Sequence, residues 1–511
     1  MPRLSAILPI LPILAIAACS SLPPGGSGPE SHALMKSPNS GVAGRFAREA
    51  ARHPGESGFA VLDGNREAFT DRVALIDFAE KTLDVQYYIW SADTIGLMLA
   101  DRLVRAADRG VRVRFLLDDV NFKKRDSATA SLAAHPNIEV RIFNPHRYRS
   151  LRGAEFLANF GRLNKRMHNK ILVMDNTCAI VGGRNIADQY FGLNEDFNNR
   201  DLDIAAAGPI VREISATFDE FWNSEAAIPI GEIVREERTM EDFHRQVATL
   251  RGNIRPERYP FPLDQDVASL RKRVDAIARN LVWAKADLLY DSFASLKQRG
   301  AGENVVDPLR RAILEADDEV LIEAAYFVMR EPAIENLASL HERGVKVRVL
   351  TNALAGNDVV AAQAGHTKRR GEVLDSGVEL YELRPDAAAV HAQLAPAAEN
   401  SRAALHTKSL VIDRKSAFVG SYNLDPRSQE INSEIGLLVH SPEFARQVAE
   451  FLDEGVRPEN AYHVTRGDHG GYQWRTVVDG QARTWNHDPE TTWTRRFLNS
   501  ALMWLPIEDQ L

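Results

Sequence analysis

A histidine, a lysine, an aspartate, a glycine and an asparagine recur at fixed spacing in two places along this 511-residue chain. The first copy is His168, Lys170, Asp175, Gly182 and Asn185, and the second is His406, Lys408, Asp413, Gly420 and Asn423. The two copies lie 238 residues apart. Composition alone would produce one copy in roughly one chain in ten thousand of this length, so two copies indicate a duplicated functional unit.

Each copy predicts a strand, a turn and a second strand, with Asp175 or Asp413 at the turn. Because successive side chains of a strand point to opposite faces, the histidine and the lysine of each copy share a face. The glycines that follow permit a tight turn that brings Asn185 and Asn423 to the same spot. Although Asp175 and Asp413 belong to the candidate catalytic pattern, we expect them to lock the turns and not to touch a substrate.

Two copies related by a pseudo-twofold axis would place two histidines, two lysines and two asparagines around one point. This inventory suits a phosphate, because the lysines and amides would stabilise charge on the non-bridging oxygens while one imidazole attacks phosphorus. The other imidazole would protonate the departing alcohol and then deprotonate the acceptor. The predicted phosphate-binding residues are Lys170, Asn185, Lys408 and Asn423.

Each histidine also needs a side chain that orients its ring. Asp201 stands eight residues before Pro209, and Glu434 stands eight residues before Pro442. We therefore assign the orienting role to Asp201 and Glu434, with Asp203 as the alternative in the first half. No metal and no cofactor are expected, since lysine is a poor ligand and the pattern does not have zinc-site spacing.

A third H-x-K sequence, at His366 and Lys368, lacks the rest of the pattern. Val373 occupies the aspartate position, and no glycine and asparagine follow. We expect this pair to be polar surface residues of a helix.

The duplication extends to whole lobes. Strand, helix and strand are predicted at 83–90, 94–109 and 111–117, and again at 320–327, 332–343 and 344–350. This order implies parallel strands in a helix-covered sheet. The predicted fold is α/β, with two repeated α/β/α lobes at 41–225 and 285–460, pseudo-twofold symmetry and one shared active site.

The remaining segments are a connector and a tail. Residues 226–284 predict a helical connector packed on one lobe. Residues 461–511 form an aromatic-rich tail, in which Asp479-Gly480 predicts a hairpin. The apolar end of the tail, 501–507, is too short to span a bilayer. We favour an apolar cap on the core there, with an interfacial membrane contact as the alternative.

Residues 1–19 predict an export signal, because Arg3 is followed by an apolar run that ends just before Cys19. This order resembles a bacterial lipobox, so we expect Cys19 to carry lipid; an uncleaved anchor and a soluble secreted protein are the alternatives. Residues 20–40 predict a flexible tether. Ser20 favours the outer membrane of a bacterial cell envelope, with the protein on its periplasmic face.

The other cysteine, Cys178, lies in an apolar run and is predicted to be a core residue. The formal net charge of −8 argues against a nucleic-acid partner, since a surface that tracks phosphates usually needs a basic excess. Local basic residues could still meet anionic headgroups, or form an ordinary solvated face. These residues are Arg147, Arg149, Arg152, Arg162, Lys165 and Arg166.

The doubled pattern H-x-K-x4-D-x6-G-(G/S)-x-N resembles the phospholipase D superfamily over residues 60–450. The resemblance implies a bilobal α/β/α fold and a covalent histidine mechanism, with His168 as nucleophile and His406 as general acid and base. Residues 161–170 and 505–508 look similar to the bacterial cardiolipin synthase C group of lipoproteins, phosphatidyltransferases that act on phosphatidylglycerol.

Phospholipid substrates and membrane contact through a lipid anchor follow from this resemblance. Phosphatidyl transfer that makes cardiolipin is the leading hypothesis, and hydrolysis of phospholipids to phosphatidic acid is the second. A nuclease or phosphodiesterase, and a non-catalytic lipid-binding lipoprotein, are less favoured; the intact double pattern argues against the last.

Overall fold

The computed structural model describes residues 28–504 apart from 123, 256–266, 358, 468–469 and 479. The predicted export signal, Cys19, the first part of the tether and the chain beyond 504 lie outside the described residues. In the described part, no helix is both long and apolar enough to cross a membrane.

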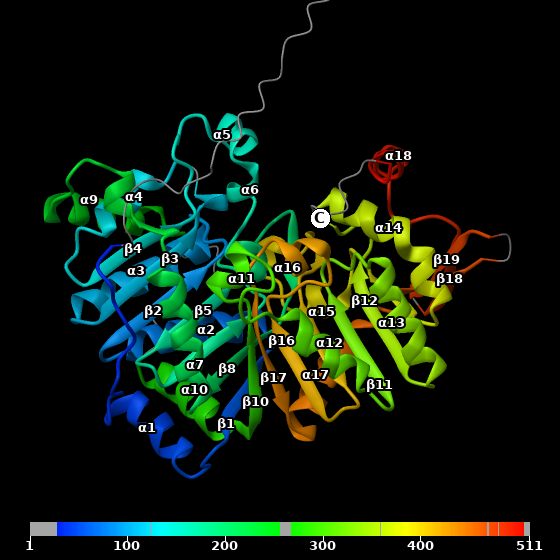
Figure 1. Ribbon diagram of the computed structural model, residues 1–511, viewed down its shortest axis with the longest axis horizontal. Helices are drawn as coiled ribbons and strands as arrows, with labels where there is room; N and C mark the ends of the chain where they lie inside the picture. Colours follow the sequence, from blue (N-terminus) through cyan, green and yellow to red (C-terminus); the bar gives the residue numbers. More distant parts are fainter. Residues whose placement is uncertain are drawn as a thin grey trace, which may run out of the picture.

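The N-terminal lobe is built on a mixed sheet (Figure 1). Its strands are β1 (Ser57–Leu62), β2 (Thr82–Tyr87), β3 (Arg112–Asp118), β4 (Ile138–Phe143), β5 (Lys170–Met174), β6 (Cys178–Gly182), β8 (Asp203–Ala207) and β9 (Ala227–Pro229). They are hydrogen-bonded in the order β9-β4-β3-β2-β5-β6-β8-β1. Only β2, β3 and β4 run parallel, as the predicted strand-helix-strand order requires.

The C-terminal lobe repeats this arrangement. Its strands are β10 (Val282–Tyr290), β11 (Glu319–Ala324), β12 (Lys346–Asn352), β13 (Glu379–Leu383), β15 (Lys408–Ile412), β16 (Ser416–Gly420), β17 (Ile435–His440), β18 (Ala461–Arg466), β19 (Tyr472–Val478) and β20 (Gln481–Trp485). Their order is β10-β17-β16-β15-β11-β12-β13-β18-β19-β20, with β11, β12 and β13 parallel. Antiparallel pairing of β1 with β10 joins the two lobes into one sheet.

Helices cover both faces of the sheet (Figure 1). In the N-terminal lobe they are α1 (Gly41–Ala50), α2 (Asn65–Phe78), α3 (Thr94–Asp108), α4 (Asp126–Leu132), α5 (Arg152–Ala158), α6 (Phe160–Leu163) and α7 (Ile210–Trp222). In the C-terminal lobe they are α11 (Phe293–Lys297), α12 (Val306–Leu314), α13 (Glu331–Glu342), α14 (Val360–Asp375), α15 (Ala388–His391), α16 (Pro426–Glu430) and α17 (Pro442–Gly455). α3 and α13 correspond: each ends before a glycine of positive φ, Gly110 (+91°) or Gly344 (+87°).

A shared apolar core holds the lobes together. Ile171 and Val173 of β5 are buried in the same cluster as Val411 of β15 and Phe444 of α17. Burying each such side chain stabilises the fold by about 1.5–3 kcal/mol. The two lobes therefore share one apolar core.

The connector and the tail differ in part from the sequence expectation. The segment 226–284 begins with the strand β9 and ends within β10. β9 pairs with β4 at one edge of the N-terminal sheet, and β10 pairs with β1 at the other. Between these strands lie α8 (Ile230–Ile233), α9 (Met240–Asn253) and α10 (Val267–Arg279), and α9 and α10 pack on the N-terminal lobe. The predicted tail hairpin is formed by β19 and β20.

The last helix, α18 (Trp493–Leu502), does not cap the core with its apolar face. The side chains of Trp493 and Phe497 are 71% and 68% exposed. Its polar side chains Arg495 and Asn499 hydrogen-bond to the lobe instead. The apolar cap was expected at 501–507, and because 505–507 lie outside the described residues, that expectation stays a prediction.

His366 lies on α14, as expected, but it is buried. Its Nε2 atom lies 3.3 Å from the carboxylate of Glu382, which also pairs with Arg370 at 2.9 Å. The predicted surface position was wrong for His366, because a buried carboxylate needs polar partners from the inner face of the helix. Lys368 does face the solvent, and Cys178 is a buried core residue of β6, as predicted.

Candidate active site

The two aspartates of the repeated pattern hold hairpin turns. Asp175 and Asn176 both have positive φ, +52° and +51°, in the turn between β5 and β6. The Asp175 carboxylate accepts hydrogen bonds from the backbone N–H groups of Glu80, Lys81 and Thr82, at 2.7–2.8 Å. Asp413 makes the equivalent contacts at the start of β11. Both carboxylates thus tie a turn to the amino end of a strand, at the opposite end of β5 or β15 from the histidine.

His168 meets a carboxylate of the other lobe. The residue before it, Met167, pairs with Ser433, and the His168 N–H donates to the Ser433 carbonyl oxygen at 3.0 Å. The next residue after Ser433 is Glu434, whose carboxylate lies 2.8 Å from His168 Nδ1. The backbone pairing between lobes therefore sets this side-chain contact.

His406 makes the reciprocal contact. Strands β7 (Phe197–Arg200) and β14 (Arg402–Leu405), one from each lobe, pair in parallel immediately before Asp201 and His406. The Asp201 carboxylate lies 2.6 Å from His406 Nδ1. Each predicted orienting carboxylate thus serves the histidine of the opposite half. The alternative, Asp203, is instead bound by Arg72 at 2.8 Å and Arg184 at 3.2 Å.

Two tyrosines hold the imidazole rings edge to face. Tyr88 lies 4.8 Å from His168 between ring centroids, and Tyr190 lies 4.9 Å from His406. The sequence analysis singled out neither tyrosine as a functional residue. No periodic signal could have found Tyr190, because its repeat equivalent, 238 residues later, is Ser428.

The two lysines lie beneath the histidines. Lys170 Nζ donates to the His168 carbonyl oxygen at 2.6 Å, and Lys408 Nζ donates to that of His406. Burial lowers the pKa of Lys170 well below its usual range, and the charge of Lys408 lowers it further. Because the charges of the two buried lysines oppose each other, a bound anion would stabilise both ammonium groups.

The two asparagines have different surroundings. Asn185 accepts from the Ile89 N–H at 3.2 Å and donates to the Tyr190 hydroxyl at 3.0 Å, so it also positions a ring that contacts His406. The buried Oδ1 atom of Asn423 has no hydrogen-bond partner in the described part of the chain. Because an amide Nδ2 carries two hydrogens, either side chain can still donate to a phosphate oxygen.

Known proteins share this duplicated pattern. A family model described as "Cardiolipin synthase, PLD-like domain" matches residues 73–222 and 309–455, more than half of the chain, and each match contains one copy of the pattern. The chain belongs to the phospholipase D-like cardiolipin synthase family. Membership makes the protein a phospholipase D-type enzyme and agrees with the resemblance seen in the sequence.

Three similar proteins illustrate the family and its fold. Cardiolipin synthase C of Escherichia coli is 35% identical over 473 residues, which cover 90% of this chain and 97% of that protein. An uncharacterized protein of Helicobacter pylori is 28% identical, over 91% of this chain and 92% of that one. The crystal structure of phosphatidylserine synthase from Haemophilus influenzae shares the fold, with a TM-score of 0.55, 14% identity and coverage of 91% and 100%.

The two halves of this family member's site are electrostatically unequal. Burial lowers the pKa of His168 well below its usual range, and Lys170 and Lys408 lower it further. Burial raises the pKa of Glu434 to about 7, against the opposing effect of Lys170. At neutral pH, Glu434 therefore carries less negative charge than an ordinary glutamate, and His168 is uncharged.

The other pair keeps its negative charge. Burial acts to raise the pKa of Asp201, but His406 and Lys408 hold it below its usual value. Burial and Lys408 lower the pKa of His406 to about 4, while Asp201 acts to raise it. The ionised Asp201 is thus the stronger partner for an imidazolium once an anion offsets the lysines.

The two carboxylates also have different neighbours, a glycine in one half and a serine in the other. A Cβ atom at Gly183 would lie 2.1 Å from the Oδ1 atom of Asp201, so only glycine fits. At the equivalent position, Ser421 has room for its side chain and donates its hydroxyl to Glu434. The G-(G/S) variation in the sequence pattern was the signal for this difference.

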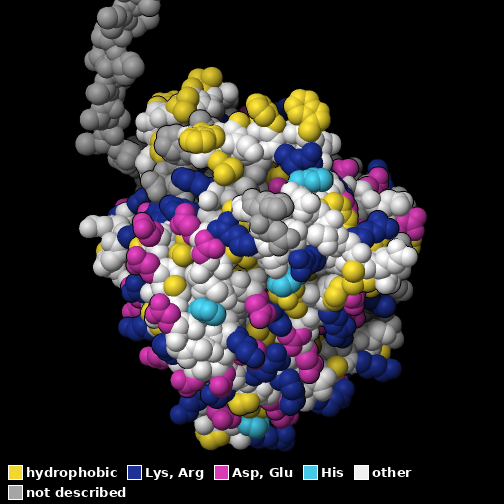
Figure 2. Space-filling view, turned by 90° about the vertical axis from the view of Figure 1, so that its right-hand side faces the viewer, with side chains coloured by type: hydrophobic (Ala, Val, Ile, Leu, Met, Phe, Trp, Pro, Cys, Tyr) yellow, Lys and Arg dark blue, Asp and Glu magenta, His cyan; other side chains and the backbone are white. Residues whose placement is uncertain are grey.

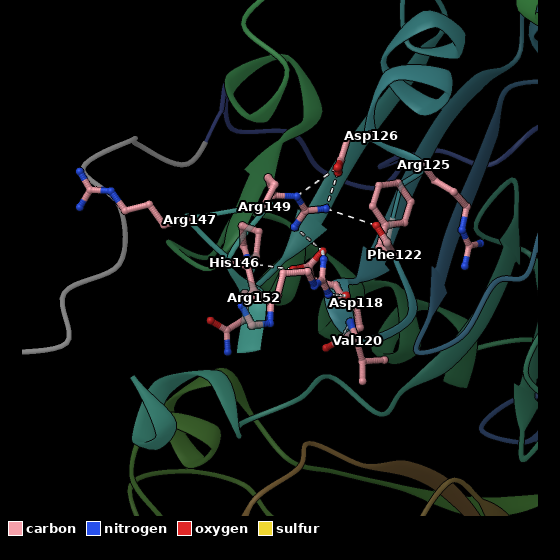
Figure 3. A network of polar contacts seen from close by, with 12 residues as sticks. Asp118, Val120, Phe122, Arg125, Asp126, His146, Arg147, Arg149 and Arg152 are labelled. Carbon is pink, nitrogen blue, oxygen red and sulfur yellow. Dashed lines mark hydrogen bonds and ion pairs between the residues drawn. The ribbon is translucent and has the colours of Figure 1, made fainter. Parts of the chain in front are cut away.

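Most of the six basic residues named from the sequence are tied into internal contacts (Figure 3). Arg149 pairs with Asp119 and Asp126, and Arg152 pairs with Asp119. Arg162, Lys165 and Arg166 have partners of their own. Arg147, at the left of Figure 3, points away from this network. The cluster is therefore neither a headgroup site nor a solvated face as a whole.

Among the described residues, no three His, Cys, Asp or Glu side chains gather closely enough to hold a metal ion. The groups that converge at the site are imidazoles, ammonium groups, amides and carboxylates, all supplied by the chain itself.

Proposed function

We propose that the protein transfers a phosphatidyl group from one phospholipid to the hydroxyl of a second, through a phosphohistidine on His168. The observation that carries this proposal is the reciprocal pairing of His168 with Glu434 and of His406 with Asp201, above two buried lysines. One site thus holds two oriented imidazoles and the charge needed for a phosphodiester.

His168 is assigned as the nucleophile. Its Nδ1 atom is held by Glu434, so Nε2 is left for attack on phosphorus. The lowered pKa of His168 keeps this nitrogen unprotonated at neutral pH. As Nε2 forms the N–P bond, the bond from phosphorus to the departing alcohol breaks, and Lys170 and Lys408 stabilise charge on the non-bridging oxygens.

His406 is assigned as the general acid and base. The phosphodiester offsets the lysine charges when it binds, which raises the pKa of His406 and lets Asp201 stabilise the imidazolium. His406 then gives its proton to the departing alcohol oxygen. In the second step it takes the proton of the acceptor hydroxyl, whose oxygen attacks phosphorus and releases His168.

Cardiolipin is the product that we assign, made by transfer of the phosphatidyl group to phosphatidylglycerol. The name of the Escherichia coli relative supports this choice, since that protein aligns over nearly the whole of both chains.

Product analysis tests the assignment. Purified protein is incubated with vesicles that contain phosphatidylglycerol and other phospholipids, and the products are identified by mass spectrometry. We expect cardiolipin and the alcohol released from the donor in equal amounts. Phosphatidic acid without cardiolipin would show that water is the acceptor and would defeat the transferase proposal.

Trapping tests the covalent step. His406→Ala protein is given a phosphatidyl donor with a nitrophenol leaving group, which departs without a proton. We expect one equivalent of nitrophenol and a stable phosphohistidine at His168, because deprotonation of the acceptor is lost. His168→Ala protein should release none, and a burst from it would contradict the assignment.

We also propose that the mature protein is anchored by lipid at Cys19, on the periplasmic face of the bacterial outer membrane. Support comes from the order of Arg3, an apolar run and Cys19 in the sequence. Globomycin, which blocks processing of lipoprotein precursors, should slow the electrophoretic mobility of the protein, and Cys19→Ser should do the same. Unchanged mobility in both would count against lipidation.

A further inference from the structure

Two sets of large apolar side chains are exposed on this protein, one in each lobe. The N-terminal set surrounds α5 and α6, and its members are Tyr148 (55% exposed), Leu151 (63%), Leu157 (79%) and Phe160 (39%). The C-terminal set is on and just after α18, and its members are Trp493 (71%), Phe497 (68%), Leu498 (51%) and Trp504 (89%). Isolated exposed apolar residues are common, but two clusters of this size mark an interaction surface.

The N-terminal set lies at the edge of the sheet that carries the histidines. Tyr87, at the carboxyl end of β2, pairs with Lys170, which places His168 at that edge. The parallel strand β4 ends at the same edge, and the chain then passes through α5 and α6 directly to His168. The N-terminal set is therefore beside the entrance to the first half of the site.

The C-terminal set lies at the equivalent edge of its own lobe. Arg495 donates to the carbonyl oxygens of Leu354 and Asn357, at 2.8 and 2.6 Å, just past the carboxyl end of β12. Ala324, at the carboxyl end of β11, pairs with Lys408, which places His406 at this edge too. Figure 1 shows α5 and α18 at the same end of the molecule, one above each lobe.

Most surface helices turn their apolar side toward the protein, whereas α18 turns its apolar side toward the solvent. Asn499, which is buried, donates to Thr367 Oγ1 at 3.0 Å, so the polar side of the helix faces the lobe. Trp493 and Phe497 are four residues apart and share the outer face. Figure 2 shows large hydrophobic side chains gathered at this end of the molecule. A helix with this pattern is suited to lie in a membrane interface.

The charge around both sets is complementary to anionic lipid. The chain has a formal net charge of −8, yet residues 491–504 contain Arg495 and Arg496 and no acidic residue. Beside the N-terminal set, Arg147 points away from the internal network (Figure 3). Arg147 is exposed, whereas Arg495 and Arg496 are partly buried and donate to backbone carbonyl oxygens. An exposed arginine beside apolar side chains, and a second apolar set without acidic neighbours in its segment, favour a surface of anionic phospholipid headgroups.

We propose that these two sets dock the protein on an anionic phospholipid bilayer, with the aromatic and leucine side chains in the interface and Arg147 on the headgroups. Docking in this orientation turns the edge that carries His168 and His406 toward the lipid. The idea deepens the proposed function, since it explains how a lipid substrate reaches a buried site, but the docking itself does not require turnover.

Tryptophan fluorescence tests the docking without relying on catalysis. Full-length His168→Ala protein is mixed with phosphatidylglycerol vesicles whose acyl chains carry bromine, a short-range quencher. We expect quenching, and we expect it to be lost in a Trp493→Phe/Trp504→Phe variant. Equal quenching with and without these two tryptophans would overturn the proposal, as would the absence of quenching in the parent protein.

Turnover supplies the second test, with variants of each set. Trp493→Ser/Phe497→Ser/Leu498→Ser and Leu151→Ser/Leu157→Ser should each lower activity on vesicles at least tenfold and leave activity on a water-soluble, short-chain phospholipid unchanged. Met35→Ser is the control, because Met35 is 97% exposed but adjoins the turn at the opposite end of β5. Vesicle activity equal to wild type in both variants would overturn the proposal. Failure of the wild type on both substrates would instead contradict the proposed function, and the quenching test would still report docking.

Discussion

The imidazole of His168 and the carboxylate of Glu434 are 2.8 Å apart, although 266 residues separate them in the sequence. His406 and Asp201 make the mirrored contact at 2.6 Å across 205 residues. Each half of the chain thus supplies one histidine and the carboxylate that orients the histidine of the other half. Neither lobe contains a complete histidine and carboxylate pair.

The crossed pairing predicts which variants behave alike. Asp201→Asn should resemble His406→Ala, because both weaken the acid and base: a nitrophenol donor still reacts, and the phosphohistidine accumulates. Glu434→Gln should impair the same step as His168→Ala: the phosphohistidine still forms, but about 100-fold or more slowly. Single-turnover kinetics with the activated donor separate the two steps. If Asp201→Asn instead slowed formation and Glu434→Gln slowed breakdown, pairing within each half would be indicated.

The neighbouring Gly183 and Ser421 should respond differently to alanine. Gly183→Ala places a methyl group against the Asp201 carboxylate, so we expect activity to fall by about 100-fold as His406 loses its orientation. Ser421→Ala removes one hydrogen bond to Glu434, and a loss of about tenfold is expected. Steady-state assays, with circular dichroism as the check on folding, compare the two. A larger loss for Ser421→Ala would contradict the steric role of position 183.

Stability should depend on pH through Glu434. Its pKa is raised in the folded protein to about 7 from an ordinary 4.5, so between these values the folded state holds a proton that the unfolded state has lost. Wild-type stability therefore falls as pH rises from 4.5 to 7. Glu434→Gln removes this effect and should gain stability relative to wild type over that window, by up to about 3 kcal/mol. Urea denaturation at a series of pH values measures the difference.

Asp201→Asn is the matched control for the pH experiment. The folded-state pKa of Asp201 is lowered, so its ionised form contributes stability that is lost as pH falls below the ordinary value of 3.8. The variant should therefore be less stable than wild type at neutral pH, and the difference should shrink in acid. The same pH trend in both variants would show that the carboxylates are not held in opposite electrostatic environments.

The turn aspartates should affect stability and not the chemical step. Asp175→Ala leaves three backbone N–H groups at the start of β2 without their acceptor, so a loss of about 2–4 kcal/mol in the free energy of unfolding is expected. Asp413→Ala should be milder, because the start of β11 is more exposed. Turnover per folded molecule should stay close to wild type in both. A large fall in kcat without a change in the urea midpoint would assign Asp175 to the chemistry.

His366 provides a control for the repeated pattern. It begins an H-x-K sequence, but it lies on α14 and contacts Glu382. His366→Gln should retain activity and lose about 1–2 kcal/mol of stability, because a buried carboxylate loses part of its pairing. His168→Gln, assayed in parallel, should be inactive and folded. Loss of turnover in a folded His366→Gln protein would show that the short H-x-K match is enough to mark a catalytic residue.

The sequence by itself determined the duplication, the family resemblance and the elements that carry the repeated pattern. The spacing from His168 to Asn185 is local, and hairpins and strand-helix-strand units are also local, so their patterns can be recognised in a chain. The candidate residues Asp201 and Glu434 could be chosen in the same way, by matching the distance to a proline in each half.

Only the tertiary structure decided which carboxylate meets which histidine. That choice depends on pairing between β7 and β14, and between Met167 and Ser433, which are far apart in the chain. Tyr190 reached His406 for the same reason. The sequence also did not predict which side chains are buried. His366 is buried, and α18 turns its apolar face outward. Most residues of the basic cluster are paired internally. A sequence pattern shows which face of a segment is apolar. Which other segment packs against that face depends on contacts between residues far apart in the chain.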